Sequence, residues 1–192
     1  VRILMAASFR EKKGIAYGLQ AFADAVKKYP EMVLRIVGGA KTQEEHRLLE
    51  SCKIIVKRER LANKVHFLGY IPYCSYLSEL ESAHLFLAPS VRAVNGDTEG
   101  GAPVSLIEAA AGGMPVISTM HCDIPNVVVD GKSGLLVPER DVPALTEAIL
   151  KLACSPEVWG GFGAAGRKRV EEEFNATKQV ARLESIYEES VL

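Results

Sequence analysis

Short apolar runs alternate with amphipathic stretches along the whole chain. The apolar runs are nearly continuous, which is typical of strands that are buried on both faces of a sheet. We predict strands at residues 2–7, 33–37, 65–68, 85–88, 116–118 and 134–137. Strands that alternate with helices favour a parallel sheet covered by helices on both faces, which is a doubly wound α/β fold.

The segments between the strands have the spacing of amphipathic helices. Between residues 15 and 29, apolar side chains recur at positions 15, 19, 22, 23 and 26, and Pro30 ends the pattern. Thr42, with Glu45 three residues later, resembles a capping box and opens a predicted helix that runs to about Leu61. Further helices are expected at residues 73–82, 103–111, 142–153, 156–173 and 176–192.

The chain is long enough for one large globular domain or for two very small ones. The chain has 192 residues, of which 48% are hydrophobic, and this is enough for a full core. A formal net charge of −1 gives no reason to expect a nucleic acid partner. No apolar run approaches the ~20 residues of a membrane span, and the start of the chain lacks the pattern of a signal peptide. We therefore expect a cytoplasmic protein with four reduced, scattered cysteines.

In a doubly wound sheet, ligands bind beyond the carboxyl ends of the strands. One segment at that edge, NGDTEGGAPVSLIEAAAGGMPV (residues 95–116), places small residues directly before a predicted helix. Small residues let a ligand approach the backbone, and the partial positive charge of a helix N-terminus suits a phosphate group. Lys13 and Arg10 follow the first strand and would lie on the same edge. A diphosphate site and a tight turn with two solvated basic residues are both consistent with this pattern.

Glu108 lies near the second turn of the same predicted helix, and helical side chains lean toward the N-terminus. A carboxylate there can accept two hydrogen bonds from the 2′- and 3′-hydroxyls of a ribose. A nucleotide site and a partly exposed glutamate that binds nothing fit the composition equally well. By contrast, the adjacent His121, Cys122 and Asp123 do not converge easily on one ion, so we expect a loop there and no metal site.

The segment EGGAPVSLIEAAAGGMPVIST resembles the signature of retaining glycosyltransferases with the GT-B fold, known as group 1 or family four. That group includes sucrose and glycogen synthases and many bacterial mannosyl- and glucosyltransferases. ILMAASFREKKGIAYGLQAF resembles the first strand, loop and helix of the group's donor domain, and VHFLGYIP, LFLAPSV and DGKSGLLVP resemble later segments in the same order. The resemblance implies the C-terminal, nucleotide-sugar half of a two-domain enzyme.

This resemblance also implies how the chain is divided. Residues 1–173 would form the Rossmann-like donor domain, and residues 174–192 a helix that crosses to an N-terminal acceptor domain. The chain begins on an apolar run without an initiating Met, so we expect a fragment of a longer protein. The last helix carries an apolar stripe that would lack its partner. We therefore predict that Ile186, Tyr187, Val191 and Leu192 are more exposed than core residues such as Val37 and Leu87.

The resemblance assigns roles residue by residue. Glu108 corresponds to the second glutamate of the family's paired-glutamate motif, which binds the donor ribose, and Glu99 to the first, which lies against the donor sugar. Lys13 matches the lysine that binds the diphosphate. Gly69 and Tyr70 resemble the segment whose backbone contacts the base. The loop whose backbone faces the sugar and diphosphate corresponds to Gly100, Gly101, Ala102, Pro103 and Val104.

Three positions depart from the family pattern. Eight residues separate the two glutamates where the family has seven, so the loop must absorb one residue if Glu99 is to reach the sugar. The family's phosphate-binding arginine falls on Ser8, and Arg10 would substitute if strand pairing continues to residue 10. Asn126 stands where glutamate is common.

The implied reaction transfers a hexosyl group from a nucleoside diphosphate sugar to a hydroxyl acceptor, with anomeric retention and without a metal ion or cofactor. Lys13 and Arg10 would stabilise the leaving diphosphate, and Glu99 would hold the sugar. The acceptor, a sugar or lipid-linked glycan, would bind through the N-terminal domain. Two alternatives share the pattern, namely a binding or regulatory module without chemistry and a GT-B sugar-nucleotide epimerase.

One basic stretch raises the alternative of peripheral contact with the cytoplasmic membrane face. The residues are Lys53, Lys57, Arg58, Arg60 and Lys64, with Ile54, Ile55 and Val56 among them. Such a stretch can lie on a membrane. Glu59 interrupts it, which favours a solvated outer helix face.

Overall fold

The computed structural model describes residues 1–190 of the chain. A six-stranded parallel sheet forms its centre, with the strand order β3-β2-β1-β4-β5-β6. The strands are β1 (Arg2–Ala6), β2 (Val33–Val37), β3 (Val65–Gly69), β4 (Leu85–Ala88), β5 (Val116–Thr119) and β6 (Gly134–Val137). Each strand ends within one residue of its predicted bounds, and the doubly wound α/β fold is confirmed.

Eight α-helices and two 3-10 turns connect and follow the described strands. They are η1 (Glu11–Lys13), α1 (Ile15–Lys28), α2 (Gln43–Arg58), α3 (Tyr73–Ser82), α4 (Val104–Ala111), α5 (Ile124–Val127), α6 (Val142–Ala153), η2 (Pro156–Val158), α7 (Trp159–Glu173) and α8 (Ala176–Ser190). The predicted capping box is confirmed, because the Glu45 N–H donates to Thr42 Oγ1 and the Glu45 carboxylate accepts from the Thr42 N–H. The turn η1 and the four-residue α5 were not predicted, since both are too short to show a period.

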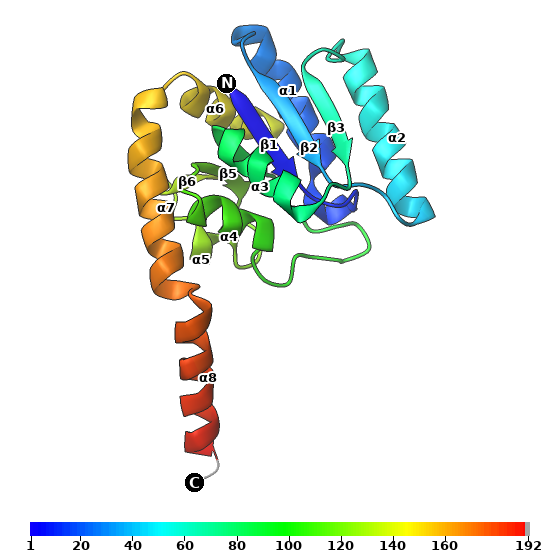
Figure 1. Cartoon of the computed structure of the whole chain (residues 1–192). Coiled ribbons are helices and arrows are strands. Elements are labelled where there is room, and N and C mark those ends of the chain that lie inside the picture. The colour runs from blue at the N-terminus through cyan, green and yellow to red at the C-terminus, as the bar shows by residue number, and fades with distance from the viewer. Residues whose placement is uncertain (191–192) are drawn as a thin grey trace.

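The sheet separates two cores, because successive strand residues face opposite sides. In β1, Ile3 and Met5 pack with residues of α1, α2 and α6, whereas Leu4 packs with residues of α3, α4, α5 and α7. Figure 1 shows the two helical layers on either side of the strands. Burial on both faces explains why the strands read as nearly continuous apolar runs.

The strand order places a switch point between β1 and β4, because the chain proceeds to one side after β1 and to the other after β4. Gly14 lets the two segments beyond these strands approach each other. It has a φ of +62°, and a Cβ at this position would lie 1.7 Å from the carbonyl oxygen of Pro89. The crevice in which such folds bind ligands is therefore bordered by the loops after β1 and β4.

Helix α8 lies outside both cores, and none of its residues is buried. Ile186 and Tyr187 are 51% and 65% exposed, compared with 9% for Val37 and 1% for Leu87, so the predicted exposure of these two residues is confirmed. Val191 and Leu192 fall outside the described residues. Figure 1 shows α8 projecting away from the sheet, on the side of the strands' carboxyl ends.

The basic stretch begins on α2 and continues past the end of that helix at Arg58, and its charged side chains are largely solvated, as the interrupted pattern favours. Ile55 and Val56 are buried in the core, and Ile54 alone of the three apolar residues is exposed. Lys53 pairs with Glu50 on the same helix. Within residues 1–190, no helix has both the length and the apolar character needed to cross a membrane.

Candidate functional site

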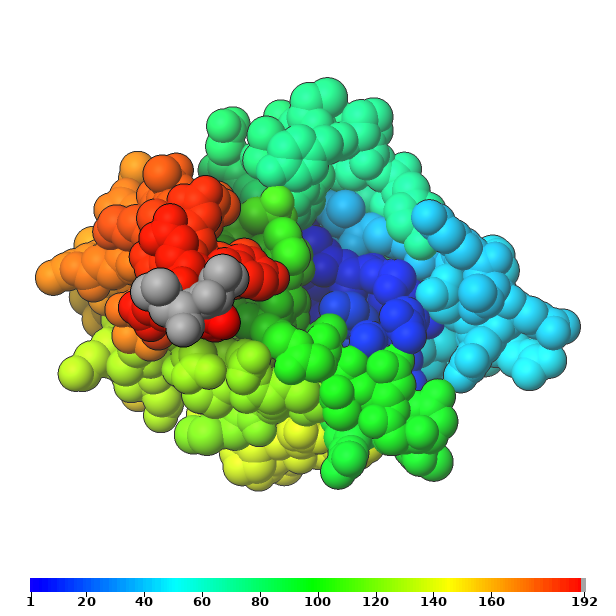
Figure 2. All heavy atoms as spheres, turned by 90° about the horizontal axis from the view of Figure 1, so that it is seen from below, coloured from blue at the N-terminus to red at the C-terminus, as the bar shows by residue number. Residues whose placement is uncertain are grey.

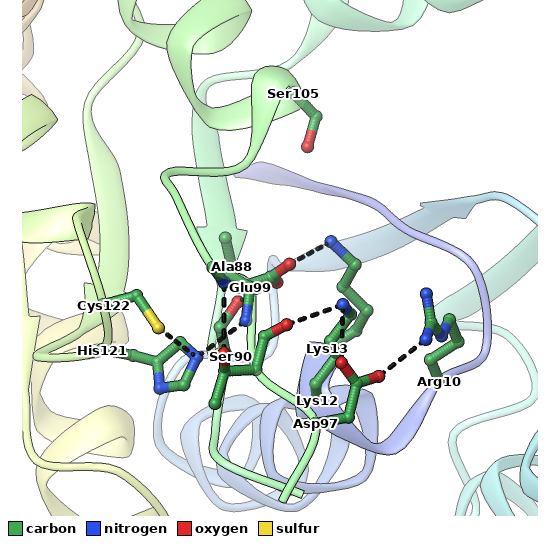
Figure 3. Close-up of polar contacts among 12 residues, drawn as sticks. Arg10, Lys12, Lys13, Ala88, Ser90, Asp97, Glu99, Ser105, His121 and Cys122 are labelled. Carbon is green, nitrogen blue, oxygen red and sulfur yellow. Dashed lines mark hydrogen bonds and ion pairs between the residues drawn. The ribbon is translucent and has the colours of Figure 1, made fainter.

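Lys13 and Glu99 meet at the switch point between β1 and β4. Lys13 Nζ lies 2.7 Å from Glu99 Oε2, and the Ser90 hydroxyl donates to Glu99 Oε1 at 2.7 Å (Figure 3). The Glu99 side chain is only 5% exposed and that of Lys13 is 21% exposed. A carboxylate so removed from water needs such partners, because an unpaired buried charge is costly. Two of the residues singled out in the sequence, 86 positions apart, thus share one small site.

Asp97 forms a second charged cluster two residues before Glu99. It accepts from Arg10 at 2.6 Å and from Lys12 at 3.1 Å, and Lys12 also donates to the Thr98 carbonyl at 2.7 Å. The bond from Lys12, with the nearby charge of Arg10, holds the pKa of Asp97 below its ordinary value. Neither Lys12 nor Asp97 was singled out in the sequence, because their importance depends on contacts across the fold.

Arg10 therefore points away from the Lys13–Glu99 pair (Figure 3). Backbone pairing beyond β1 continues only to Phe9, whose N–H donates to the Gly39 carbonyl. The Arg10 N–H turns back to the Ser8 carbonyl, so both residues belong to a turn and not to an extended strand. The condition under which Arg10 would share a face with Ser8 is not met.

His121 lies behind Glu99 and is almost fully buried, with 3% of its side chain exposed. Its Nε2 accepts from the Glu99 backbone N–H at 3.2 Å, and its Nδ1 lies 2.6 Å from Glu139 Oε1. Burial would raise the pKa of Glu139, but the bonds from the Arg92 N–H and from His121 outweigh it and hold that pKa below its ordinary value. His121 thus binds the backbone of the loop that carries Glu99. Among the described residues, no cluster of side chains is suited to a metal ion.

Glu108 lies on α4 and faces the beginning of α3. Its carboxylate accepts from the Tyr73 hydroxyl at 3.0 Å and from the Tyr76 hydroxyl at 2.9 Å. Tyr76 is buried, and this burial, together with the bond to Glu108, raises the pKa of its hydroxyl far above the ordinary value. The two tyrosines were missed in the sequence, although their spacing of three residues on one helix face is a signal that could have found them.

The remaining candidates form the rim of this edge. Gly100, with a φ of +76°, turns the chain from Glu99 into α4, and Val104 begins that helix exposed to solvent. Gly69 ends β3 with a φ of +69°, and Tyr70 is exposed with the Lys41 ammonium 5.1 Å from its ring centre. Gly101, Ala102 and Pro103 complete the loop before α4.

Figure 2 views this edge from below. The N-terminal segment, in blue, lies between the cyan residues of α2 and the green chain near residue 100. The space between Lys13, Glu99, Ser90 and Ser105 measures only about 10 Å³, which is room for about one water molecule. Larger cavities of about 640 Å³ and 410 Å³ lie beside Arg10 and beside Glu108. A diphosphate would have to lie on the outer side of the Lys13–Glu99 pair.

Comparison with known proteins identifies the family. Residues 1–155 match the family model described as Glycosyl transferases group 1. The chain belongs to this family. The amylovoran biosynthesis glycosyltransferase AmsK of Erwinia amylovora is 32% identical over 186 residues, which cover 95% of this chain and 44% of AmsK. The chain thus spans less than half the length of that relative.

Solved structures of glycosyltransferases confirm the GT-B type of Rossmann-like fold. Sucrose-phosphate synthase from Thermosynechococcus elongatus superposes with a TM-score of 0.82 and 26% identity, over 99% of this chain and 45% of the synthase. HepE of Anabaena, solved in complex with UDP and glucose, superposes with a TM-score of 0.81 and 19% identity, over 96% of this chain and 48% of HepE. The resemblance inferred from the motifs is therefore confirmed for the family and the fold.

Proposed function

We propose that this chain is the donor-binding domain of a glycosyltransferase that moves a hexosyl group from a nucleoside diphosphate sugar to a hydroxyl acceptor, with anomeric retention, in polysaccharide or glycoconjugate synthesis. The observation that carries the proposal is the meeting of Lys13 with the buried Glu99 at the switch point. Family membership supports the transfer, and the part of AmsK in amylovoran biosynthesis supports a polysaccharide product. The HepE complex with UDP and glucose supports a sugar nucleotide as donor, by analogy of fold.

Lys13 is the residue that we assign to the diphosphate. The leaving diphosphate gains negative charge in the transition state, and a fixed ammonium group stabilises that charge. The N–H groups in the first turn of α4 add to it, because Pro103 at the N-cap provides no side-chain acceptor for them. Arg10 can contribute only after it leaves Asp97, which Lys12 continues to hold.

Glu108 is assigned to the donor ribose. Each carboxylate oxygen has two acceptor directions, so the bonds from Tyr73 and Tyr76 leave one direction on each oxygen for a ribose hydroxyl. The buried Tyr76 fixes the carboxylate in place. The exposed Tyr73 begins α3, three residues along the chain from Tyr70 in the segment that we assign to the base.

We assign the acceptor, a sugar or lipid-linked glycan, to the part of the protein outside this chain. The apolar stripe of α8 is suited to contact that part, because Val180, Leu183 and Ile186 are all exposed. We propose that α8 crosses to an acceptor domain there, and that neither a metal ion nor another cofactor is needed for the donor to bind.

The proposal is tested by calorimetric titration of the chain with UDP-, GDP- and ADP-sugars, without added metal and again with Mg²⁺. Binding of at least one donor without metal is expected. Failure of all of them, including with the remainder of the protein supplied, would refute the donor site. With the complete protein and an acceptor, a regulatory module would bind without turnover, and an epimerase would change the donor without using the acceptor.

The ribose assignment has its own test. Glu108→Gln keeps the shape of the side chain and removes the charge that strengthens the diol contacts. Charge-assisted hydrogen bonds contribute roughly 1.5–3 kcal/mol, so affinity for the nucleoside diphosphate should fall at least about tenfold. A 2′,3′-dideoxy ligand should bind wild type poorly, and its affinity should fall little further in Glu108→Gln. Equal sensitivity of both proteins to removal of the diol would refute the assignment.

A further inference from the structure

The surroundings of His121 determine which ring nitrogen carries its proton. The Glu99 backbone N–H lies 3.2 Å from Nε2 and can only donate, so Nε2 must accept. The Cys122 sulfur lies 3.2 Å from the same Nε2, and a thiol hydrogen there would share the single lone pair of Nε2 with the Glu99 N–H. Nδ1 then bears the hydrogen and donates it to Glu139 Oε1 at 2.6 Å. The ring is therefore neutral and has one tautomer.

Glu139 is itself held from other directions. Its second oxygen accepts from the backbone N–H of Arg92 at 2.7 Å, and Arg140 lies 3.5 Å from the same oxygen. Glu139 follows β6, His121 follows β5, and Arg92 follows β4. The chain Arg92–Glu139–His121 thus ties together the segments beyond three adjacent strands, and it ends on the backbone of Glu99.

Glu99 is bound in two distinct ways. Its carboxylate interacts with Lys13 and Ser90, and its backbone N–H with His121. A diphosphate would compete for Lys13, whereas the bond to His121 uses only groups of the protein. The next residue, Gly100, has a positive φ and little conformational restraint of its own, so the loop needs an external contact to hold Glu99 in one position.

We propose that His121, oriented by Glu139, is a positioning residue that holds the backbone of Glu99 and thereby sets the fit of the donor's sugar, while the nucleotide part binds independently of it. The inference rests on the proposed function, in which Glu99 lies against the sugar. It adds a pair of residues that do not touch the donor and that act on its sugar through the loop.

Two substitutions separate the two bonds of the ring. His121→Asn keeps a donor near the position of Nδ1, facing Glu139, and removes the acceptor for the Glu99 N–H. His121→Gln keeps an acceptor near the position of Nε2 and removes the contact with Glu139. A matched control is His84→Gln, because His84 Nδ1 accepts from the backbone N–H of Arg2 at 2.9 Å at the other end of the sheet.

The experiment titrates each variant with the sugar nucleotide that wild type binds best and with the corresponding nucleoside diphosphate. Loss of a hydrogen bond that leaves a buried N–H unpaired corresponds to about a tenfold change. His121→Asn should therefore weaken the sugar nucleotide about tenfold and leave the nucleoside diphosphate within about twofold. His121→Gln keeps the acceptor but loses its orientation by Glu139, so its loss should be smaller than that of His121→Asn without disappearing. His84→Gln should change neither affinity.

Equal losses for both ligands, or no loss for either, in His121→Asn would overturn the inference and leave the proposed function intact. If wild type binds neither ligand, the proposed function fails and the inference fails with it. A measurement on wild type without ligand tests the inference even if His121→Asn does not fold. The ¹⁵N shifts of the His121 ring in wild type should show a protonated Nδ1 and a bare Nε2, and the opposite tautomer would overturn the inference directly.

Discussion

The two tyrosines that hold Glu108 differ sharply in burial, and this difference predicts unequal effects of the same substitution. Tyr76 is 8% exposed and Tyr73 is 62% exposed, although their hydroxyls lie at nearly equal distances of 2.9 Å and 3.0 Å from the Glu108 carboxylate. Tyr→Phe removes only the hydroxyl and keeps the ring, so each variant isolates one hydrogen bond.

The expected loss of stability depends on whether water can replace the hydroxyl that each substitution removes. A hydrogen bond to a charged group contributes about 1.5–3 kcal/mol where water cannot replace it, which is the situation of Tyr76. Water can replace the exposed hydroxyl of Tyr73, and surface substitutions usually stay within about 0.5 kcal/mol. Tyr76→Phe should thus lower the free energy of unfolding by about 1.5–3 kcal/mol and the Tm by about 3–12 °C. Tyr73→Phe should have almost no effect.

Urea denaturation followed by the fluorescence of the single tryptophan, Trp159, measures both free energies of unfolding. In a Glu108→Gln background the cost of Tyr76→Phe should shrink, because the charge on the acceptor is gone. Equal losses for the two phenylalanine variants, or an unchanged cost in the Gln background, would refute the reasoning.

Other predictions concern pH, thiol reactivity and local opening. The bond from Arg35 lowers the pKa of Glu79, so the stability from this pair is present above the unfolded-state pKa of about 4.3 and is lost as pH falls through the folded-state value. Glu79→Gln should therefore flatten the acid limb of the unfolding free energy, and an unchanged limb would contradict this. Burial raises the pKa of Cys52 to about 12, so iodoacetamide should label it only on unfolding, unlike the other three, exposed cysteines. Residues 176–190 should exchange amide hydrogens fast, since none is buried, and protection equal to that of the central strands would show a docked helix.

The fold was largely predictable from the sequence because its strands are buried on both faces. In a sequence of alternating strands and helices, a continuous apolar run such as residues 85–88 is typical of a strand in the middle of a parallel sheet, where helices cover both faces. What the sequence could not predict are short or composite elements. The expected helix at residues 156–173 begins as the 3-10 turn η2 and becomes α7 only at Trp159, since the register of a helix start depends on local contacts.

The contacts at the candidate site could not be predicted from the sequence. Lys13 and Glu99 were each recognisable beside a strand end, yet their pairing depends on how the loops after β1 and β4 pack. His121 was noticed only as a poor metal ligand, because nothing in the neighbouring sequence indicates Glu139 as its partner. Contacts between residues far apart in the sequence carry no local pattern, and these contacts are what give the site its electrostatic character.

The pairing of Lys13 with Glu99 has a consequence for ligand binding. The ammonium that would bind a diphosphate is already held by a carboxylate that is 5% exposed, so a diphosphate must compete with it. Glu99→Gln removes that competitor and keeps an amide of similar shape beside Ser90. The variant should bind a free nucleoside diphosphate up to about tenfold more tightly than wild type, while its preference for the sugar nucleotide falls. Isothermal titration of both ligands measures this, and weaker binding of the free nucleoside diphosphate by Glu99→Gln would show that Glu99 does not compete for Lys13.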